Sequence, residues 1–177
     1  MDSVRRVVFT APEQAQIETA YTPRPPEADQ VALRTRWSLI STGTELAVYT
    51  NTNALGRSAA WQYPHYPGYA AAGVVETAGA TNHRLTDGAL VLAVVGHASR
   101  AHFRPDRTLH VRLPDDFPLH FAPFIRMALV SLASLRQADV LAGEWLGVVG
   151  LGLVGNLGAQ FGLAAGFRVI GVGRSEL

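Results

Sequence analysis

The spacing of apolar residues changes about two thirds of the way along the chain, near Pro114. Before that point, residues 31–39 alternate apolar and polar positions, which is the period of a half-buried strand. Short apolar runs bounded by glycine and proline predict further strands at residues 7–9, 72–77, 89–95, 103 and 111–113. Closely spaced short strands of this kind favour a small β-barrel or sandwich.

After Pro114 the pattern is that of helices alternating with strands. Apolar residues at positions 125, 128, 129, 132 and 135 have helical spacing, with Pro123 in the first turn and Arg136 and Gln137 at the end. The residues that follow predict a βαβ unit, namely a buried strand at 145–149, a helix at 154–165 and a second strand at 169–172. We therefore expect an α/β plus β fold with two domains, at residues 1–120 and 121–177.

Composition narrows the possible functions. The chain has 177 residues and a net charge of +1, so no bulk field favours nucleic acid or an anionic membrane as a partner. It contains no lysine, which excludes a lysine Schiff base and a P-loop lysine. It also contains no cysteine, which excludes disulfides, thiolate zinc sites and thiol nucleophiles and is compatible with a cytoplasmic location.

One uncharged stretch, residues 146–167, is long enough to span a bilayer, and its glycines at 158, 162 and 166 form a small-xxx-small pattern. Glycines at 147, 150, 152 and 155 make its first half a poor helix former, and Arg168 follows at once. We therefore favour packing within a domain over a membrane span.

Residues 150–155 read Gly-Leu-Gly-Leu-Val-Gly, between a predicted strand and a predicted helix. That context is typical of a dinucleotide-binding turn. Gly150 permits the tight turn, Gly152 lets the backbone approach a diphosphate, and Gly155 lets helix and strand pack closely. The helix start offers free N–H groups to the phosphates, although a turn that only packs is the alternative. The predicted cofactor contacts here are Gly150, Gly152, Leu153, Val154 and Gly155.

The end of the second predicted strand favours NADP(H) over NAD(H). An acidic residue that binds the ribose hydroxyls of NAD is expected there, but the chain has Gly173, Arg174 and Ser175. A guanidinium and a hydroxyl suit a 2′-phosphate. In the alternative, Arg174 is simply solvated and Glu176 binds the ribose of NAD.

Three further segments resemble the medium-chain dehydrogenase/reductase superfamily, the relatives of zinc-type alcohol dehydrogenases. Residues 40–45 (ISTGTE) are similar to its I-C-G-T-D segment, residues 67–75 (PGYAAAGVV) to its G-H-E segment, and residues 86–91 (TDGALV) to its V-G-D-R-V turn. The resemblance implies a GroES-like barrel domain for substrate at 1–120, followed by the first βαβ unit of a Rossmann domain at 121–177. It also implies that substrate binds between the two domains.

The catalytic zinc of that family does not carry over to these residues. Thr42, Tyr69 with Ala70, and Ile125 stand where the resemblance places the ligands, and none of these side chains suits Zn²⁺. The six histidines show no ligand-type spacing, so a polar structural role is favoured for each, His97 and His102 included. We expect no metal, as in the zinc-lacking branch of the superfamily.

A metal-free enzyme must polarise the substrate oxygen with hydrogen bonds. Thr44 matches the family's proton-relay hydroxyl. Tyr69 replaces a metal ligand and could donate its phenol proton to an oxyanion, or could merely fill the vacated space. Thr42 is a weaker third candidate, and Glu45 is expected to order its loop.

The predicted function is that of a zinc-independent oxidoreductase using NADP(H) and a small carbonyl, enone or quinone. Alternatives are a non-catalytic nucleotide-binding or scaffold relative and an oligomerising barrel module. About half of the family's polypeptide is encoded, so we expect a C-terminally truncated chain. The expected partners are a small-molecule substrate and either further copies of the chain or a complementing C-terminal polypeptide.

Overall fold

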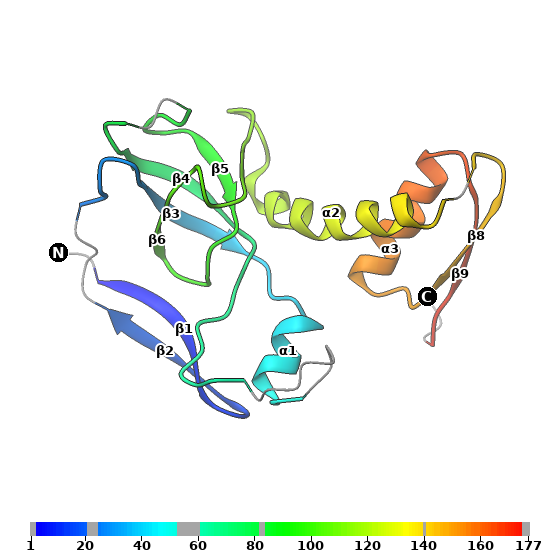
Figure 1. Ribbon diagram of the computed structural model, residues 1–177, viewed down its shortest axis with the longest axis horizontal. Helices are drawn as coiled ribbons and strands as arrows, with labels where there is room; N and C mark the ends of the chain where they lie inside the picture. Colours follow the sequence, from blue (N-terminus) through cyan, green and yellow to red (C-terminus); the bar gives the residue numbers. More distant parts are fainter. Residues whose placement is uncertain (1–2, 21–24, 53–60, 82–83, 140, 175–177) are drawn as a thin grey trace. The chain divides into compact units, whose positions relative to one another are not determined.

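The computed structural model describes residues 3–20, 25–52, 61–81, 84–139 and 141–174. The chain divides into two compact units, Met1–Pro123 and Phe124–Leu177. The first unit consists mainly of antiparallel strands and the second of helices with two parallel strands (Figure 1). Each unit is described separately below.

The first unit begins with a hairpin of β1 (Val4–Ala11) and β2 (Gln14–Ala20). Strand β2 was not predicted, because its residues are mostly polar and lack an apolar run. Its Ile17 is 71% exposed, so pairing with β1 rather than burial holds the strand. Across the hairpin Arg6 donates to Glu18 at 2.8 Å, and this hydrogen bond lowers the pKa of the Glu18 carboxyl.

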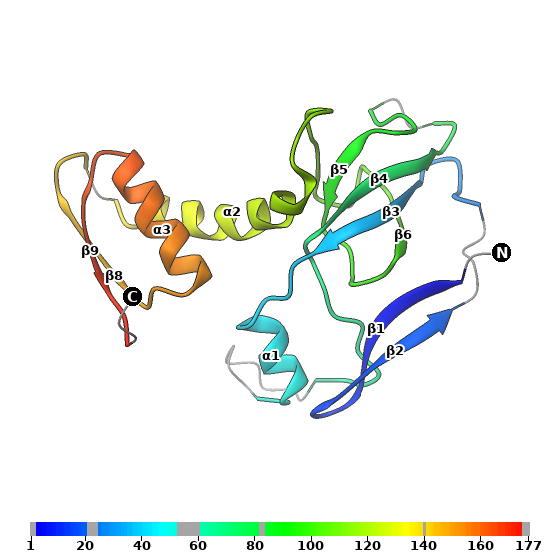
Figure 2. The same cartoon turned by 180° about the vertical axis from the view of Figure 1, so that it is seen from behind.

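Five further strands form an antiparallel sheet in the order β6-β3-β4-β5-β7. They are β3 (Val31–Ser38), β4 (Ala71–Ala78), β5 (Leu90–Ala93), β6 (Arg100–Phe103) and β7 (His110–Arg112). Figure 2 labels β3, β4, β5 and β6. The predicted strands of this region are therefore confirmed. Two isolated bridges, Arg6 to Ala98 and Phe9 to His65, link the hairpin to the chain around the sheet. Closure of these strands into one barrel remains a prediction.

The core of the first unit is built around this sheet. Val31 and Leu33 on β3, Val75 on β4 and Val91 on β5 are all at most 1% exposed. The predicted alternation nevertheless fails along β3, because Trp37 is 54% exposed although it falls in step with Val31 and Leu33. The register with β4 shifts between Thr35 and Trp37, and a one-residue shift moves later side chains to the other face.

Two short helical segments complete the first unit. Helix α1 (Thr44–Tyr49) follows the end of β3, and a 3-10 turn, η1 (Leu119–Phe121), precedes the long helix α2 (Ala122–Gln137). Helix α1 was not predicted as a helix, since six residues are too few to show a helical period. Helix α2 ends at Gln137, as predicted.

The second unit contains the predicted strand-helix-strand sequence. Strands β8 (Trp145–Val149) and β9 (Arg168–Val172) pair in parallel, with α3 (Leu153–Ala164) between them in the chain. Ser131 of α2 donates to the Val154 carbonyl of α3 at 2.8 Å, which ties the two helices together. The prediction that the first strand is buried is wrong, because Trp145 is 62% and Val149 87% exposed. In the described chain β8 has one neighbouring strand, β9.

The uncharged stretch at 146–167 is divided between β8, the glycine turn and the twelve-residue α3. Within the part of the chain that the structure describes, no helix is long and apolar enough to cross a membrane. Close packing explains one of its glycines directly, since a Cβ on Gly162 would lie 2.7 Å from Leu146 of β8.

Gly73→Ala tests the close approach of β4 to β3. A Cβ on Gly73 would overlap the backbone carbonyl of Arg34, and backbone cannot move aside as a side chain can. We expect the substitution to lower the free energy of unfolding by about 3 kcal/mol, the upper end of the range for overpacking. Urea unfolding followed by far-UV circular dichroism measures this loss.

Gly147→Ala is the matched control, because Gly147 also lies within a strand but has no described atom within 4 Å of its added Cβ. This variant should be no less stable than the wild type. Equal stability of the two variants would contradict the close approach of Gly73 to the Arg34 carbonyl.

Candidate functional site

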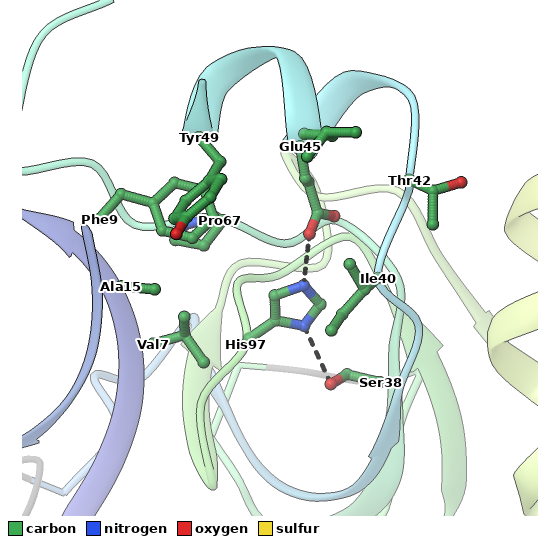
Figure 3. Close-up of a pocket in the computed structure, with 11 residues that line it drawn as sticks. Val7, Phe9, Ala15, Ser38, Ile40, Thr42, Glu45, Tyr49, Pro67 and His97 are labelled. Carbon is green, nitrogen blue, oxygen red and sulfur yellow. Dashed lines mark hydrogen bonds and ion pairs between the residues drawn. The ribbon is translucent and has the colours of Figure 1, made fainter. Parts of the chain in front are cut away.

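A cavity of 440 Å³ opens in the first unit among the hairpin, the end of β3 and helix α1 (Figure 3). Its walls are mainly apolar. The lining residues are Val7, Phe9, Ala15, Ser38, Ile40, Thr42, Glu45, Leu46, Tyr49, Pro67 and His97.

Three of the polar lining residues form one hydrogen-bonded chain. The His97 ring contacts Ser38 Oγ through Nδ1 at 2.9 Å and Glu45 Oε2 through Nε2 at 2.8 Å, as the dashed lines in Figure 3 show. The His97 and Glu45 side chains are only 7% and 6% exposed, whereas Ser38 is an exposed residue. The network therefore runs from an exposed serine residue to a buried carboxylate.

Backbone hydrogen bonds fix the position of His97 from two directions. Its N–H donates to the Pro67 carbonyl at 2.9 Å, and its own carbonyl accepts from the Val7 N–H at 2.9 Å. The ring is thus held on the chain that leaves β5, between strand β1 and the segment before β4. Because these hydrogen bonds fix the backbone, the His97 ring can contact Ser38 and Glu45 at the same time.

The two ring nitrogens allow this network to hold a proton in two arrangements. When Glu45 is ionised and His97 neutral, Nε2–H donates to the carboxylate and Nδ1 accepts the Ser38 hydroxyl proton. When His97 is an imidazolium, both nitrogens donate, and the Ser38 hydroxyl is free to donate elsewhere. A ligand oxygen beside Ser38 can therefore meet either an acceptor or a donor.

Glu45 depends on its hydrogen bond to His97 to offset the cost of burying its carboxylate. Its second oxygen, Oε1, is buried and accepts no hydrogen bond from any residue in the described ranges. A buried carboxylate without a partner is costly, so most of its stabilisation comes through Oε2 and the His97 ring.

The residues predicted to be catalytic occupy different places. Thr42 is exposed and lines the cavity, whereas Thr44 is the exposed first residue of α1, and Tyr69 is half-buried in the bend before β4. Thr44 and Tyr69, both described, are not among the lining residues of this cavity. The roles of all three side chains remain predictions.

Sequence reasoning missed Ser38 and treated His97 as structural. His97 lies 59 residues from Ser38 and 52 from Glu45 along the chain, so no local spacing connects them. The signal available in the sequence was Glu45 within the ISTGTE segment, which was expected only to order its loop.

The second unit holds a larger cavity, of 720 Å³, at the carboxyl ends of β8 and β9 beside the start of α3. Its lining includes the first half of the predicted dinucleotide turn, residues 150–152, together with Arg174. The lining residues are Val149, Gly150, Leu151, Gly152, Val172, Gly173 and Arg174. Leu153 and Val154 form the first turn of α3, and Ser175 and Glu176 lie outside the described residues.

The three glycines of the turn differ in whether the fold would tolerate a side chain at their position. Gly150 has φ +90°, a conformation that glycine adopts without strain, and a Cβ on Gly155 would overlap the Gly150 carbonyl. Within the described ranges, Gly152 has no atom within 4 Å of an added Cβ. The fold therefore needs the first and third glycines, while the space before Gly152 is open to a ligand at the helix start.

No set of three or more histidine, aspartate or glutamate side chains that could hold a metal occurs among the described residues. Of the positions where the family resemblance places zinc ligands, Thr42 lines the cavity of the first unit and Ile125 lies on α2.

No protein-family profile matches the chain. A curated relative, alcohol dehydrogenase notN of Aspergillus sp. (strain MF297-2), is 30% identical over 79 residues, which cover 45% of this chain and 23% of that protein. The chain thus spans less than a quarter of this relative's length in the match.

Solved structures resemble the chain over nearly its whole length. A thermostable alcohol dehydrogenase from Pyrobaculum aerophilum has a TM-score of 0.78 and 23% identity over 98% of this chain and 60% of its own. Escherichia coli quinone oxidoreductase complexed with NADPH has a TM-score of 0.76 and 18% identity over 97% of this chain and 53% of its own. The chain shares the fold of these structures over the part of them that it covers, and it spans about half of their length. The resemblance is therefore confirmed at the level of the fold.

A double-mutant cycle tests the coupling of His97 to Glu45. Each single change, Glu45→Leu or His97→Leu, should lower the free energy of unfolding by about 3–5 kcal/mol, because one buried polar partner remains uncompensated. The double variant should lose at least about 1 kcal/mol less than the sum of the two. Urea unfolding of all four proteins measures the difference, and additive losses would show that the pair is not coupled.

Proposed function

We propose that this chain belongs to a zinc-independent oxidoreductase of the medium-chain dehydrogenase/reductase superfamily. In this proposal it transfers a hydride between NADP(H) and a small carbonyl, enone or quinone. The observation that supports it most directly is the open space before Gly152, at the carboxyl ends of two parallel strands and the start of α3.

The turn at 150–155 has the features that a diphosphate requires. Backbone N–H groups in the first turn of α3 have no carbonyl one turn earlier to bond, so they are available to phosphate oxygens. Gly152 places no side chain between those groups and the cavity. When bound, the dinucleotide supplies or accepts the hydride, and these residues hold its diphosphate.

Arg174 supports NADP(H) rather than NAD(H). It is exposed and lines the cavity beside Gly173, at the end of β9, where its guanidinium could pair with a 2′-phosphate. The Ser175 hydroxyl is proposed as a second donor. The E. coli quinone oxidoreductase of similar fold was solved with NADPH, which agrees with this choice.

We also propose that hydroxyl groups take the place of a metal in the first unit. Thr42, Tyr69 and Ala70 stand at positions where the family resemblance places zinc ligands, and neither a hydroxyl nor a methyl group is a good ligand for that ion. Thr44 and Tyr69 are proposed as donors to the oxygen that gains charge during reduction, with Thr42 as a third. In this proposal residues 1–120 bind substrate and residues 121–177 bind the cofactor.

Gly152→Val tests the turn. The protein has room for the added side chain, so the variant should fold, but the valine would occupy the space in front of the helix start. Loss of two charge-assisted hydrogen bonds corresponds to about a 100-fold weaker Kd for NADPH. Isothermal titration calorimetry with the full chain measures the affinity.

Gly147→Ala, which also adds a Cβ to open space but lies in β8 away from the cavity lining, is the control and should bind NADPH normally. Unchanged NADPH binding by Gly152→Val would remove the basis of the proposed function.

Arg174→Ala tests the choice of cofactor. Its removal should weaken NADPH binding about 10- to 100-fold, because a hydrogen bond between charged groups contributes about 1.5–3 kcal/mol, and should leave NADH binding unchanged because NADH lacks the 2′-phosphate. Parallel titrations with both dinucleotides give the two ratios. Equal weakening for NADPH and NADH would mean that Arg174 does not read the 2′-phosphate.

A further inference from the structure

We propose that a second pocket of the first unit binds the phosphate group of a small organic phosphate. The pocket has a volume of 350 Å³ and lies where strand β1 meets residues 97–99 and the end of β3. It differs in its lining from the cavity beside α1, although Val7, Ser38 and His97 line both. All of its lining residues belong to the first unit, so binding there requires no dinucleotide.

The lining of this pocket is strongly basic. It contains three arginines, Arg5, Arg6 and Arg36, and its described residues include no carboxylate. The whole chain has a net charge of only +1, so these positive charges are concentrated at one place. Positive charges that share a concave surface raise the local concentration of anions. The pocket therefore favours a negatively charged ligand.

One of the three arginines is already engaged within the protein. Arg6 Nε donates to the Glu18 carboxylate at 2.8 Å, and Arg6 Nη2 donates to the Tyr66 hydroxyl at 3.1 Å. The same guanidinium lies 4.0 Å from the centre of the Tyr66 ring, which is a cation–π contact. Arg6 is therefore a fixed part of the wall, and the charge available to a ligand comes from the other two.

Arg5 and Arg36 have no such partner. Both are exposed, and the guanidinium of neither one pairs with a carboxylate in the described ranges. Two unpaired guanidinium groups carry two positive charges and can each offer a planar pair of N–H donors. A phosphate monoester is a dianion with three terminal oxygens, so it can neutralise both groups, whereas a carboxylate can neutralise only one.

The register shift of β3 explains why Arg36 belongs to this pocket. Thr35 pairs with Gly73 of β4 and Trp37 with the adjacent Ala72, so Arg36 is the extra residue of a β-bulge. A bulge frees its extra residue from the alternation of the strand and re-aims the side chain. On the other edge of the strand the Thr35 N–H donates to the Ser99 carbonyl at 3.0 Å, which holds the bulge beside the pocket.

Two hydroxyl groups in the lining can add hydrogen bonds to a phosphate oxygen. Ser99 Oγ accepts the Arg5 backbone N–H at 3.0 Å, which leaves its own proton free to donate. Thr35 Oγ1 is buried and has no hydrogen-bond partner among the described residues. An unsatisfied buried hydroxyl is costly in the free protein, so a ligand oxygen that reached Thr35 would gain that hydrogen bond without breaking another.

The pocket also has an apolar side that suits an organic group attached to the phosphate. Val7 and Ile17 face each other across the hairpin of β1 and β2, and both line the pocket together with Ala98. Ile17 is 71% exposed, so its side chain is available for contact. The volume of 350 Å³ lies within the range of about 300–1,000 Å³ usual for small-molecule sites.

The experiment titrates phenyl phosphate, inorganic phosphate and benzoate into the full chain and follows backbone amides by NMR, without dinucleotide. Phenyl phosphate should bind more tightly than benzoate, which has one charge, and more tightly than inorganic phosphate, which has no apolar group. The amides of residues 5–7 and 98–99 should shift together. Equal affinities for phenyl phosphate and benzoate would overturn the assignment of a phosphate.

Arg36→Gln removes one of the two unpaired charges. Because Arg36 is exposed and makes no ion pair with a described residue, the variant should fold normally. It should bind phenyl phosphate about fivefold more weakly, the upper end of the effect of an exposed ion pair. Arg36→Lys keeps the charge but not the paired N–H donors, so it should lose less affinity than Arg36→Gln.

Arg136→Gln is the matched control, because Arg136 is another exposed arginine with no ion pair to a described residue and lies on α2, outside the lining. It removes the same charge from the chain and should leave the affinity for phenyl phosphate unchanged. Equal weakening by Arg36→Gln and Arg136→Gln would show that net charge alone attracts the anion. No weakening by Arg36→Gln would overturn the site.

The same titrations separate this pocket from the glycine turn, which could also bind a phosphate. Gly152→Val should leave the shifts at residues 5–7 and 98–99 unchanged, because that turn belongs to the second unit. Shifts that appear only at residues 150–155 would overturn the inference and leave the proposed function intact. Phosphate binding at residues 5–7 and 98–99 by a chain that binds no NADPH would support this pocket and reject the dinucleotide proposal.

Discussion

The antiparallel pairing of β3 on both of its edges is the constraint on which the first unit depends. This strand hydrogen-bonds to β4 on one side and β6 on the other, and its Val31 and Leu33 are fully buried. The shift of register near Thr35 then turns the end of the strand, where Ser38 lies, away from the alternation of the core. The same strand therefore supplies both the centre of the hydrophobic core and the first residue of the hydrogen-bonded chain.

The polar network beside that core combines burial with a route to the surface of the cavity. His97 and Glu45 are shielded from water, which strengthens their interaction but also makes each dependent on the other. Ser38, whose Oγ lies 2.9 Å from His97 Nδ1, also lines the cavity.

The second unit uses glycine for two separate purposes. At Gly150 and Gly155 the chain itself excludes a side chain, because of a positive φ at the first and a backbone overlap at the second. At Gly152 none of the described residues lies close enough to prevent a side chain, and the position lines a cavity that also reaches Arg174. This contrast is a stronger reason to propose a ligand there than the glycine pattern alone.

The βαβ unit, the glycine turn, α2 and most strands of the sheet could be predicted from the sequence, because each depends on local periodicity or on backbone freedom at single glycines. It did not show β2, which pairs through its backbone with few buried side chains, or the outward turn of Trp37, which a register shift produces. Only the tertiary structure joined Ser38, Glu45 and His97. Their contacts arise from strand pairing and backbone hydrogen bonds between distant segments, and such contacts leave no spacing in the sequence.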